Sequence, residues 1–577
     1  MKIKTIITLV ILSAVNINLF GAQSPDEIQR NIDAYYQDRL RQFEIQNRTS
    51  ISKEKETPQS PPEQKLSSVK KLFKEIIVKH SGVRGISWRK INKLTAKYKN
   101  IPMSYDDITA LQNEIQQIFL AAGYSSARVY IDSEAFSRDI LEYPVFEGNI
   151  EKLAFKRKSG RKYGRLAQAL QSFSFYPFAK DSLLNIKDLD QGIEQMNRLS
   201  TGNAVLTIVP GDKDGYSVVE ITNNAKNRFI ISLGADNSGA QSNGLYRGNS
   251  SISADNLLML NDNISFSYSR NIDGIDKDKS SNNYFASFSI PFGYFTFMAS
   301  SFYSDYSVPA GLSVGDYTTD GATKNSNISL ETIIKRSDGY KISAGAEGSL
   351  KETVNNVAGE KVDVSSRKLS IASVFLTHTQ SLNGGNVYSK VSYNRGLDCF
   401  DAVKNTPESL NSPKGQFYSV SLYAQYMQYF KVPFTSFTLN YSLALNAQYS
   451  PDILYSSEQT AIGGQSSVRG FKEGSVSGDS GAYVKNTLSF NLSEIFKRNG
   501  FFNLLSATKI SAFFDSGYAR HAAYGKDYQL SGGGAGVSYN SKYFNVNGVW
   551  SRAILNRSDL AYEGNVFYFN IEGKIYF

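Results

Sequence analysis

Residues 226–577 alternate apolar and polar side chains with a period of two and show no helical periodicity. The clearest segment is FTLNYSLALNAQYS, residues 437–450, where the odd positions are apolar or aromatic and the even positions are mainly Thr, Asn, Ser and Gln. Successive side chains of a strand point to opposite faces, so this segment predicts a strand with one apolar and one polar face. Four other segments follow the pattern less regularly: NYFASFSI (283–290), YFTFMASSFY (294–303), FYSVSLYAQYMQY (417–429) and YFNVNGVW (543–550).

The last segment, NVFYFNIEGKIYF at 565–577, has aromatic and aliphatic residues on one face and Tyr, Asn, Glu and Lys on the other. An edge strand of a soluble β-sandwich would also alternate, but charges facing a lumen and aromatic rings facing lipid fit this segment better. Short connections such as PFG (291–293) occur beside long polar ones such as DGIDKDKSSNN (273–283). Short turns at one end and long loops at the other are typical of outer-membrane barrels. Residues 226–577 therefore predict a transmembrane antiparallel β-barrel.

Residues 69–225 have a different pattern, which predicts two small α/β modules at 69–150 and 151–225. In the first, MSYDDITALQNEIQQIFLAAGY predicts a helix that begins after Ser104 as N-cap and ends at Gly123. Asp107 completes a capping box with Ser104. In the second, NIKDLDQGIEQMNRL predicts a helix, and AVLTIVPGDKDGYSVVEIT predicts a hairpin whose Pro- and Gly-containing turn separates two strands.

The N-terminus reads as an export signal at 1–22, with a basic start, the apolar run TIITLVILSAV and a small residue, Ala22, for cleavage. A membrane anchor is the alternative, but the apolar run is short and Asn residues follow it. Residues 23–48 predict a helix that is polar almost all round, and such a helix stays in solvent or lies in a polar cavity. The Pro-, Ser-, Lys- and Glu-rich residues 49–68 predict a flexible linker.

Composition supports a membrane barrel and excludes several other classes. The chain of 577 residues contains 36 Tyr and 35 Phe at a mean hydropathy of −0.32, and it has no internal apolar run long enough for a spanning helix. The net charge of +10 is spread thinly, so we expect no nucleic-acid binding. With one Cys and three His, we expect no metal site. No phosphate-binding Gly-Lys loop and no catalytic triad pattern occurs, so we expect no cofactor, no catalytic residues and no enzyme.

The order of parts resembles the transporter component of two-partner secretion systems, the TpsB family (haemolysin-activator and filamentous-haemagglutinin transporters) of the Omp85 superfamily. The two modules look like POTRA domains, and LDQGIEQMNRL followed by VPGDKDGYS is similar to the second of them. Two motifs carry the resemblance in the barrel. VRGF at Val468, Arg469, Gly470 and Phe471 resembles the signature of the sixth extracellular loop, and ISAFFDSGYA resembles its wall strand through Phe513, Asp515 and Gly517.

The resemblance implies a barrel of about sixteen strands whose VRGF loop folds back into the lumen, where Arg469 meets Asp515. The alternation agrees, because Ile510, Ala512 and Phe514 share the lipid-facing side and leave Asp515 facing inward. Arginine suits this contact, since its planar fork bonds a carboxylate bidentately and stacks on aromatic rings. A solvated loop is the alternative. A terminal Phe577 resembles the signal by which the barrel-assembly machinery recognises a barrel for insertion.

Asn197, Arg198 and Leu199 match the family pattern at the end of the second POTRA helix and are candidates for substrate capture. The alternative is that they simply cap that helix.

The implied function is capture of an unfolded exoprotein, a large TpsA-like protein, by POTRA modules in the periplasm and its passage through the barrel to the cell surface without ATP. The implied location is the outer membrane of a Gram-negative bacterium, surrounded by lipid. Residues 23–48 would plug the lumen at rest, a periplasmic tail being the alternative. The other candidate functions are an outer-membrane protein assembly factor of the same superfamily, a passive porin or receptor, and an outer-membrane hydrolase.

Overall fold

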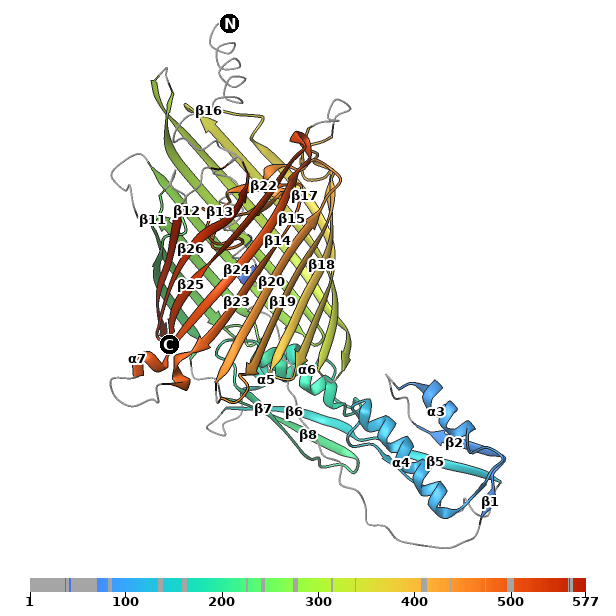
Figure 1. The fold of residues 1–577 in the computed structure, drawn as a ribbon. Coiled ribbons are helices and arrows are strands. Elements are labelled where there is room, and N and C mark those ends of the chain that lie inside the picture. The colour runs from blue at the N-terminus through green and yellow to red at the C-terminus, as the bar shows by residue number, and fades with distance from the viewer. Residues whose placement is uncertain are drawn as a thin grey trace.

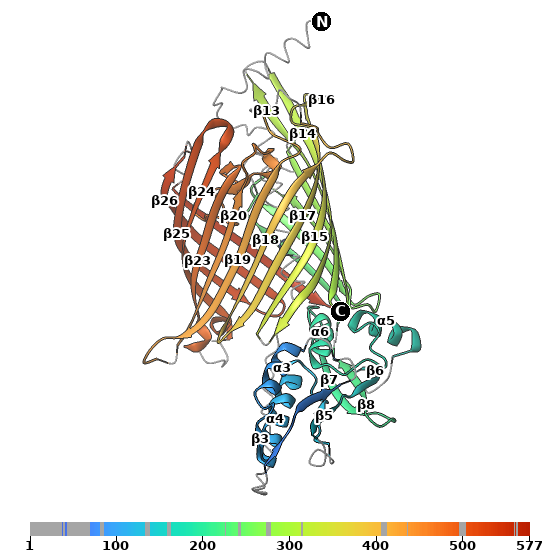
Figure 2. The same ribbon diagram turned by 90° about the vertical axis from the view of Figure 1, so that its right-hand side faces the viewer.

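The protein consists of a β-barrel and two α/β modules at one of its ends (Figures 1 and 2). The computed structural model describes residues 37, 41, 42 and 70–577 apart from short gaps at 81–82, 84–85, 133–138, 158–162, 225–226, 240–243, 273–278, 313–314, 338, 406–411, 436, 473, 496–502, 559 and 561–563. The expected signal peptide at 1–22, the linker at 49–68 and most of the polar helix at 23–48 lie outside the described residues.

Sixteen long antiparallel strands of the described chain form the barrel wall, each paired with the next. The two-residue β16 (Glu360–Lys361) pairs antiparallel with the last two residues of β15 (Tyr340–Val357). The expected fold class is thus confirmed. The strands are β9 (Phe229–Asp236), β10 (Arg247–Asp255), β11 (Asn263–Asn271), β12 (Ser280–Phe292), β13 (Phe295–Leu312), β14 (Gly315–Ser337), β15 (Tyr340–Val357), β17 (Arg367–Leu382), β18 (Gly385–Leu397), β19 (Tyr418–Lys431), β20 (Thr438–Tyr449), β23 (Ser480–Asn491), β24 (Thr508–His521), β25 (Lys526–Asn540), β26 (Phe544–Arg557) and β27 (Asn565–Tyr576).

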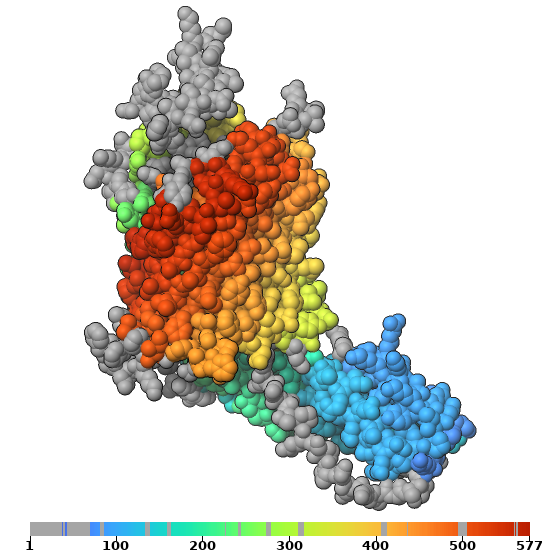
Figure 3. All heavy atoms as spheres, viewed as in Figure 1, coloured from blue at the N-terminus to red at the C-terminus, as the bar shows by residue number. Residues whose placement is uncertain are grey.

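The barrel closes where β27 pairs with β9, in a register running from Asn570 opposite Asp236 to Tyr576 opposite Ile230. Beyond this ladder, the backbone N–H of Phe577 donates to the carbonyl of Phe229 at 2.9 Å, and the N–H of Phe229 donates to the carbonyl of Phe577 at 3.1 Å. The seam is therefore hydrogen-bonded like the other strand pairs. The face of the barrel formed by its yellow, orange and red strands is continuous in the space-filling view (Figure 3). A closed wall has no strand edge, so no backbone N–H or C=O group is left unpaired against lipid, which cannot form hydrogen bonds.

The period-two alternation sorts side chains as expected. On β27, Asn570 and Glu572 border a lumen cavity, and on β20 Ser442 and Ala444 border the same cavity together with Leu443 between them. Phe567 and Ile575 of β27 lie on the outside and are exposed. Most turns next to the α/β modules, such as the one between β12 and β13, are short, and most connections at the opposite end are longer. The long β23–β24 connection (492–507) and the short β24–β25 connection (522–525) are exceptions.

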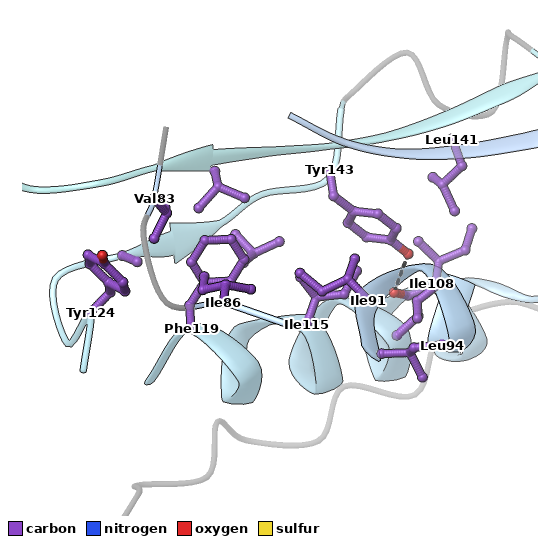
Figure 4. Packing of buried hydrophobic residues seen from close by; sticks show 14 of the residues in the cluster. Val83, Ile86, Ile91, Leu94, Ile108, Ile115, Phe119, Tyr124, Leu141 and Tyr143 are labelled. Carbon is purple, nitrogen blue, oxygen red and sulfur yellow. Dashed lines mark hydrogen bonds between the residues drawn. The ribbon is translucent and has the colours of Figure 1, made fainter. Parts of the chain in front are cut away.

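The first module contains β1 (Lys71–Leu72), β2 (Glu75–Lys79), α3 (Trp88–Ala96), β3 (Pro102–Met103), α4 (Tyr105–Ala121), β4 (Arg128–Val129) and β5 (Ile140–Phe146). The predicted capping box is present, since the Asp107 N–H donates to Ser104 Oγ and the Ser104 N–H donates to Asp107 Oδ2. The apolar face of α4 packs under the sheet, and the buried Tyr143 hydroxyl donates to the Ile108 carbonyl at 2.9 Å (Figure 4). Burial raises the pKa of Tyr143.

The second module contains β6 (Asn149–Arg157), α5 (Arg165–Phe175), α6 (Ile186–Asn197), β7 (Ala204–Pro210) and β8 (Tyr216–Asn223). Strands β7 and β8 form the predicted hairpin, and β6 joins β8 in parallel. Helices α3 and α5 were not predicted from the sequence. None of the helices in the described chain has the length and apolar character needed to cross a membrane.

The second module is attached to the barrel by a buried ion cluster. Glu194 of α6 accepts bonds from Arg336 at the end of β14, with Nη2 to Oε1 at 2.6 Å and Nη1 to Oε2 at 2.9 Å. Lys341 at the start of β15 reaches Oε2 at 2.9 Å. The side chains of all three residues are at most a tenth exposed. A buried carboxylate between two cations fixes α6 against these two strands.

We predict that Glu194→Ala loosens this junction, because two buried cations lose the carboxylate that pairs with both, at a cost of about 3–5 kcal/mol. Hydrogen exchange of the α6 amides should become faster in the reconstituted protein, with the barrel amides unchanged. Glu220→Ala is the matched control in the same module, because its pair with Lys156 is about a quarter exposed and is worth at most about 1 kcal/mol. Equal α6 exchange in the two variants would contradict the prediction.

Candidate pore lumen and inserted loop

A loop between β20 and β23 folds back into the barrel. It carries the short helix η1 (Ser456–Glu458) and a hairpin of β21 (Thr460–Ile462) and β22 (Val476–Gly478). The hairpin packs against β24 and β23 of the wall, and its tip holds the VRGF motif. The predicted return of this loop into the lumen is therefore present, and the solvated-loop alternative does not hold.

Arg469 at the tip pairs with Asp515 of β24. Its Nε donates to Oδ2 at 2.6 Å and its Nη2 donates to Oδ1 at 2.8 Å, which is the bidentate geometry that the residue types predicted. The backbone N–H of Arg469 also donates to Oδ2 at 3.2 Å, and the N–H of Asn486 on β23 donates to Oδ1 at 3.2 Å. Asp515 is fully buried, so these four bonds replace the water that its charge would otherwise require.

The guanidinium of Arg469 has two further contacts with the wall. Its Cζ lies 3.6 Å from the centre of the Phe513 ring, close enough for a cation–π interaction. Its Nη2 also donates to Thr487 Oγ1 at 2.9 Å. Phe513 and Asp515 lie two residues apart on β24 and therefore share the inward face, so one strand supplies both the counter-charge and the ring.

Val468 and Phe471, on either side of the Arg–Gly pair, are both buried. They belong to an apolar cluster that the hairpin and the wall share, whose other buried members are Ile462, Val476, Tyr483, Ala519, Leu530 and Ala553. The Tyr568 hydroxyl of β27 donates to the carbonyl of Phe471. The loop tip thus contributes to a small hydrophobic core inside the barrel.

Three glycines make this close approach possible. Gly470 has a φ of +110°, and a Cβ there would lie 2.8 Å from the Arg552 backbone of β26. A Cβ on Gly517 would lie 2.8 Å from Val468 Cγ2. Gly532 of β25 was not predicted as a site residue, yet its Cβ would lie 1.8 Å from the Arg469 carbonyl oxygen. The signal for it was the run SGGGAG, which indicates small residues in a crowded wall.

Asp479 is a second buried anchor that sequence reasoning missed. Its carboxylate accepts from the Leu454 N–H at 2.7 Å, from Gln459 Nε2 at 3.1 Å and from the Ala522 N–H at 2.8 Å. It thereby joins both stems of the loop to the connection after β24. Nothing in its local sequence distinguishes this residue, because its partners are distant in the chain.

Polar cavities occupy the lumen beside the loop. The larger has a volume of about 750 Å³ and is bordered mainly by Ser, Asn and Gly of the wall, by Arg469 and Arg41, and by the charged wall residues Asp236, Arg247, Lys485 and Glu572. Arg41 belongs to the helix expected at 23–48. Its Nη1 donates to the Tyr483 hydroxyl at 3.1 Å, and its Cζ lies 4.9 Å from the centre of the Tyr423 ring. Gln37 borders a second cavity of about 290 Å³.

Asn197, Arg198 and Leu199 do not share one exposed surface, because Asn197 is exposed and the other two are buried. Asn197 braces the start of β7 through two bonds with the backbone of Ala204, at 2.6 and 3.0 Å. Arg198 is buried between the module and the barrel, with Nη1 bonded to Ser289 Oγ and Nη2 to the Asn261 carbonyl, both at 2.8 Å. Burial lowers the pKa of Arg198 to about 10, which still leaves it protonated near neutral pH. Leu199 is also buried, so this part of the motif holds the junction together.

A closed barrel with its own loop in the lumen and two α/β modules below defines a class, the outer-membrane transporters with POTRA domains. The family described as "Haemolysin secretion/activation protein ShlB/FhaC/HecB" matches residues 215–539. A POTRA domain matches residues 149–210, and a ShlB-type POTRA domain matches residues 77–148. The chain belongs to this haemolysin secretion/activation family, and the expected relationship to two-partner secretion transporters is confirmed.

Similar proteins agree with this assignment. The outer membrane transporter CdiB of Dickeya dadantii is 31% identical over 420 residues, which cover 72% of each chain. The hemolysin transporter protein ShlB of Serratia marcescens is 28% identical over 392 residues, 68% of each chain. The structure of CdiB from Escherichia coli has a TM-score of 0.79 at 25% identity and covers 96% of this chain and 100% of that one. The protein is therefore an outer-membrane transporter with its POTRA modules in the periplasm, and the family members are transporters, not enzymes.

We predict that Arg469→Ala releases the loop tip while the barrel stays folded, because Asp515 is left buried and unpaired at a cost of about 3–5 kcal/mol. Amide hydrogen exchange across residues 460–478 should accelerate, and the heat-modifiable gel mobility of the barrel should be unchanged. Arg520→Ala is the control on the same strand, since its contact with Asp527 is 3.9 Å long and exposed. The prediction fails if both variants protect the loop as well as the unmodified protein does.

Proposed function

We propose that this protein moves one large secreted protein, as an unfolded chain, from the periplasm through the barrel lumen to the cell surface. The observation that supports this best is the inserted loop, because Arg469, Val468 and Phe471 fill one side of a polar lumen that would otherwise be open. A pore closed by its own parts, with domains at the periplasmic mouth, suits the transport of a chain better than the free diffusion of small solutes.

Strand addition at the second POTRA module could capture the substrate. Within the described sheet, β7 pairs with β8 on one side only, and Val205 and Ile208 on it are exposed. An extended chain could bond this edge through its backbone, with weak demands on its side chains. Such a site replaces Asn197, Arg198 and Leu199 as the candidate for capture.

Passage would require no nucleotide, since the sequence has no phosphate-binding Gly-Lys loop. Folding of the exoprotein outside the cell would prevent its return. The proposal includes no catalytic residue, cofactor or metal. Its partners are a TpsA-like exoprotein, the outer-membrane lipid, and the barrel-assembly machinery that would insert the barrel through its terminal strand and Phe577.

The proposed resting state has residues 23–48 in the lumen as a plug. The contacts of Arg41 with Tyr483 and Tyr423 support this, because both tyrosines belong to the barrel wall. A polar helix is stable there, since the lumen offers hydrogen-bond partners in place of an apolar core.

The secretion function is tested by comparing culture-supernatant and outer-membrane proteins of a deletion strain with those of the complemented strain. We expect one large protein to disappear from the supernatant while the outer membrane is unchanged. Complementation with Arg520→Ala should restore secretion, and complementation with Arg469→Ala should not. Broad loss of other barrels would indicate an assembly factor, and an unchanged supernatant would indicate a passive pore; either result overturns the proposal.

The plug is tested by single-channel conductance in planar bilayers. We expect deletion of residues 24–48 to raise the mean conductance, because the helix no longer fills the lumen. Arg41→Ala should raise the frequency of open events, since it removes both contacts with the wall tyrosines. Lys74→Ala, at an exposed position of the first module, should behave like the unmodified protein. Unchanged conductance after the deletion would mean that the helix does not block the pore.

A further inference from the structure

An exposed apolar surface lies where the second POTRA module meets the barrel. On the POTRA side it contains Leu166 and Phe173 of α5 and the following Phe178, which are 74%, 51% and 88% exposed. On the barrel side it contains Leu257 and Leu258 of the β10–β11 turn, which are both exposed, and the partly exposed Phe292 of β12. These six residues are called the α5 surface below.

The opposite face of α5 is attached to the rim of the barrel. Gln171 Nε2 donates to Asn256 Oδ1 at 3.2 Å, and Asn261 Nδ2 donates to Ser174 Oγ at 2.7 Å. The N–H of Gly293 in the β12–β13 turn donates to the Ser174 carbonyl at 3.0 Å. Because its polar face is held by two turns of the barrel, the helix cannot rotate to bury Leu166 or Phe173 in the module.

The α5 surface continues the lipid-facing wall. The rings of Phe173 and Phe292 lie 4.4 Å apart between centroids. Phe292 shares the outward face of β12 with the exposed Ala286, whereas Ser281 and Asn283 of the other face border the lumen cavity. Figure 2 shows α5 at the lower ends of the barrel strands, projecting sideways from them. The surface therefore lies at the periplasmic rim of the lipid-facing wall.

Phe178 and its charged neighbours point to the same environment. Phe178 has a φ of +63°, an unfavourable backbone conformation for an aromatic residue, and it holds its ring away from the module. The exposed Arg165 and Lys180 flank Leu166 and Phe178 in sequence. Aromatic and aliphatic residues beside basic ones are typical of elements that lie in a membrane interface containing anionic lipid.

We propose that the α5 surface is an interfacial membrane contact, in which Leu166, Phe173 and Phe178 enter the headgroup and upper acyl region of the inner leaflet of the outer membrane. The contact holds the second POTRA module under the barrel from the lipid side, while the Glu194 cluster holds it from the protein side. Exposed apolar residues of this size would otherwise remain in water beside a lipid boundary that can take them up.

The test measures the environment of a nitroxide label at this surface in the full-length protein. Cys399 is replaced by Ser, and Phe178→Cys is labelled after reconstitution into vesicles of phosphatidylethanolamine and phosphatidylglycerol. Phe146→Cys of β5, at a 65% exposed position of the first module, is the aqueous control. Ile554→Cys, at a 63% exposed position on the outer face of β26, is the lipid control.

We expect the label at 178 to collide with oxygen more often than with a water-soluble nickel chelate, as at 554, and the label at 146 to show the reverse. Leu166→Cys gives a second, independent position on the surface and should agree with 178. If 166 and 178 both behave like 146, the surface faces water and the proposal is wrong. If they become shielded only when an unfolded exoprotein segment is added, the surface binds substrate, which also overturns the proposal.

Discussion

The buried carboxylate of Asp515 is the constraint on which the inside of this barrel depends. A charge without access to water must be paired and hydrogen-bonded, and within the described wall its cationic partner comes from a loop that starts at the far end of β20. This counter-charge, together with the Asp479 bonds and the apolar cluster around Val468 and Phe471, fixes where the hairpin lies. The absence of side chains at Gly470, Gly517 and Gly532 follows from it, because the backbone of the tip must come within contact distance of three wall strands.

The same principle operates at the periplasmic end, where Glu194 holds two cations from β14 and β15. The POTRA module and the inserted loop are therefore both attached to the wall by buried ion pairs. The lumen between them is lined mainly by hydroxyl and amide groups. Charged side chains such as Asp236, Arg247, Lys485 and Glu572 interrupt this lining, so a chain in transit would meet both neutral hydrogen-bonding groups and charges.

The sequence predicted the barrel because a strand between lipid and a wet lumen carries apolar and polar side chains at alternate positions. It predicted the Arg469–Asp515 pair because alternation placed Asp515 inward and a family motif supplied the partner.

The sequence did not reveal α5, whose buried residues include Gln171 and Ser174. Their partners are barrel turns about 85 residues away, and the apolar residues Leu166 and Phe173 face away from the module, so the packed face of the helix carries polar side chains. Arg198 was a candidate for substrate capture because its local sequence does not show that it is buried. It is buried against Asn261 and Ser289, which belong to the barrel. Asp479 and Gly532 likewise acquire their roles only from distant segments.

The loop tip is held by two kinds of contact that respond differently to the surrounding medium. At physiological ionic strength, salt screens interactions between exposed charges that lie more than about 8–10 Å apart, but it screens a buried pair such as Arg469–Asp515 much less. The apolar cluster around Val468 and Phe471 is, if anything, strengthened by salts that are excluded from protein surfaces. The closed arrangement should therefore persist from dilute to saline surroundings. That property suits a protein whose outer face has no compartment to buffer it against the changing ionic strength of the medium.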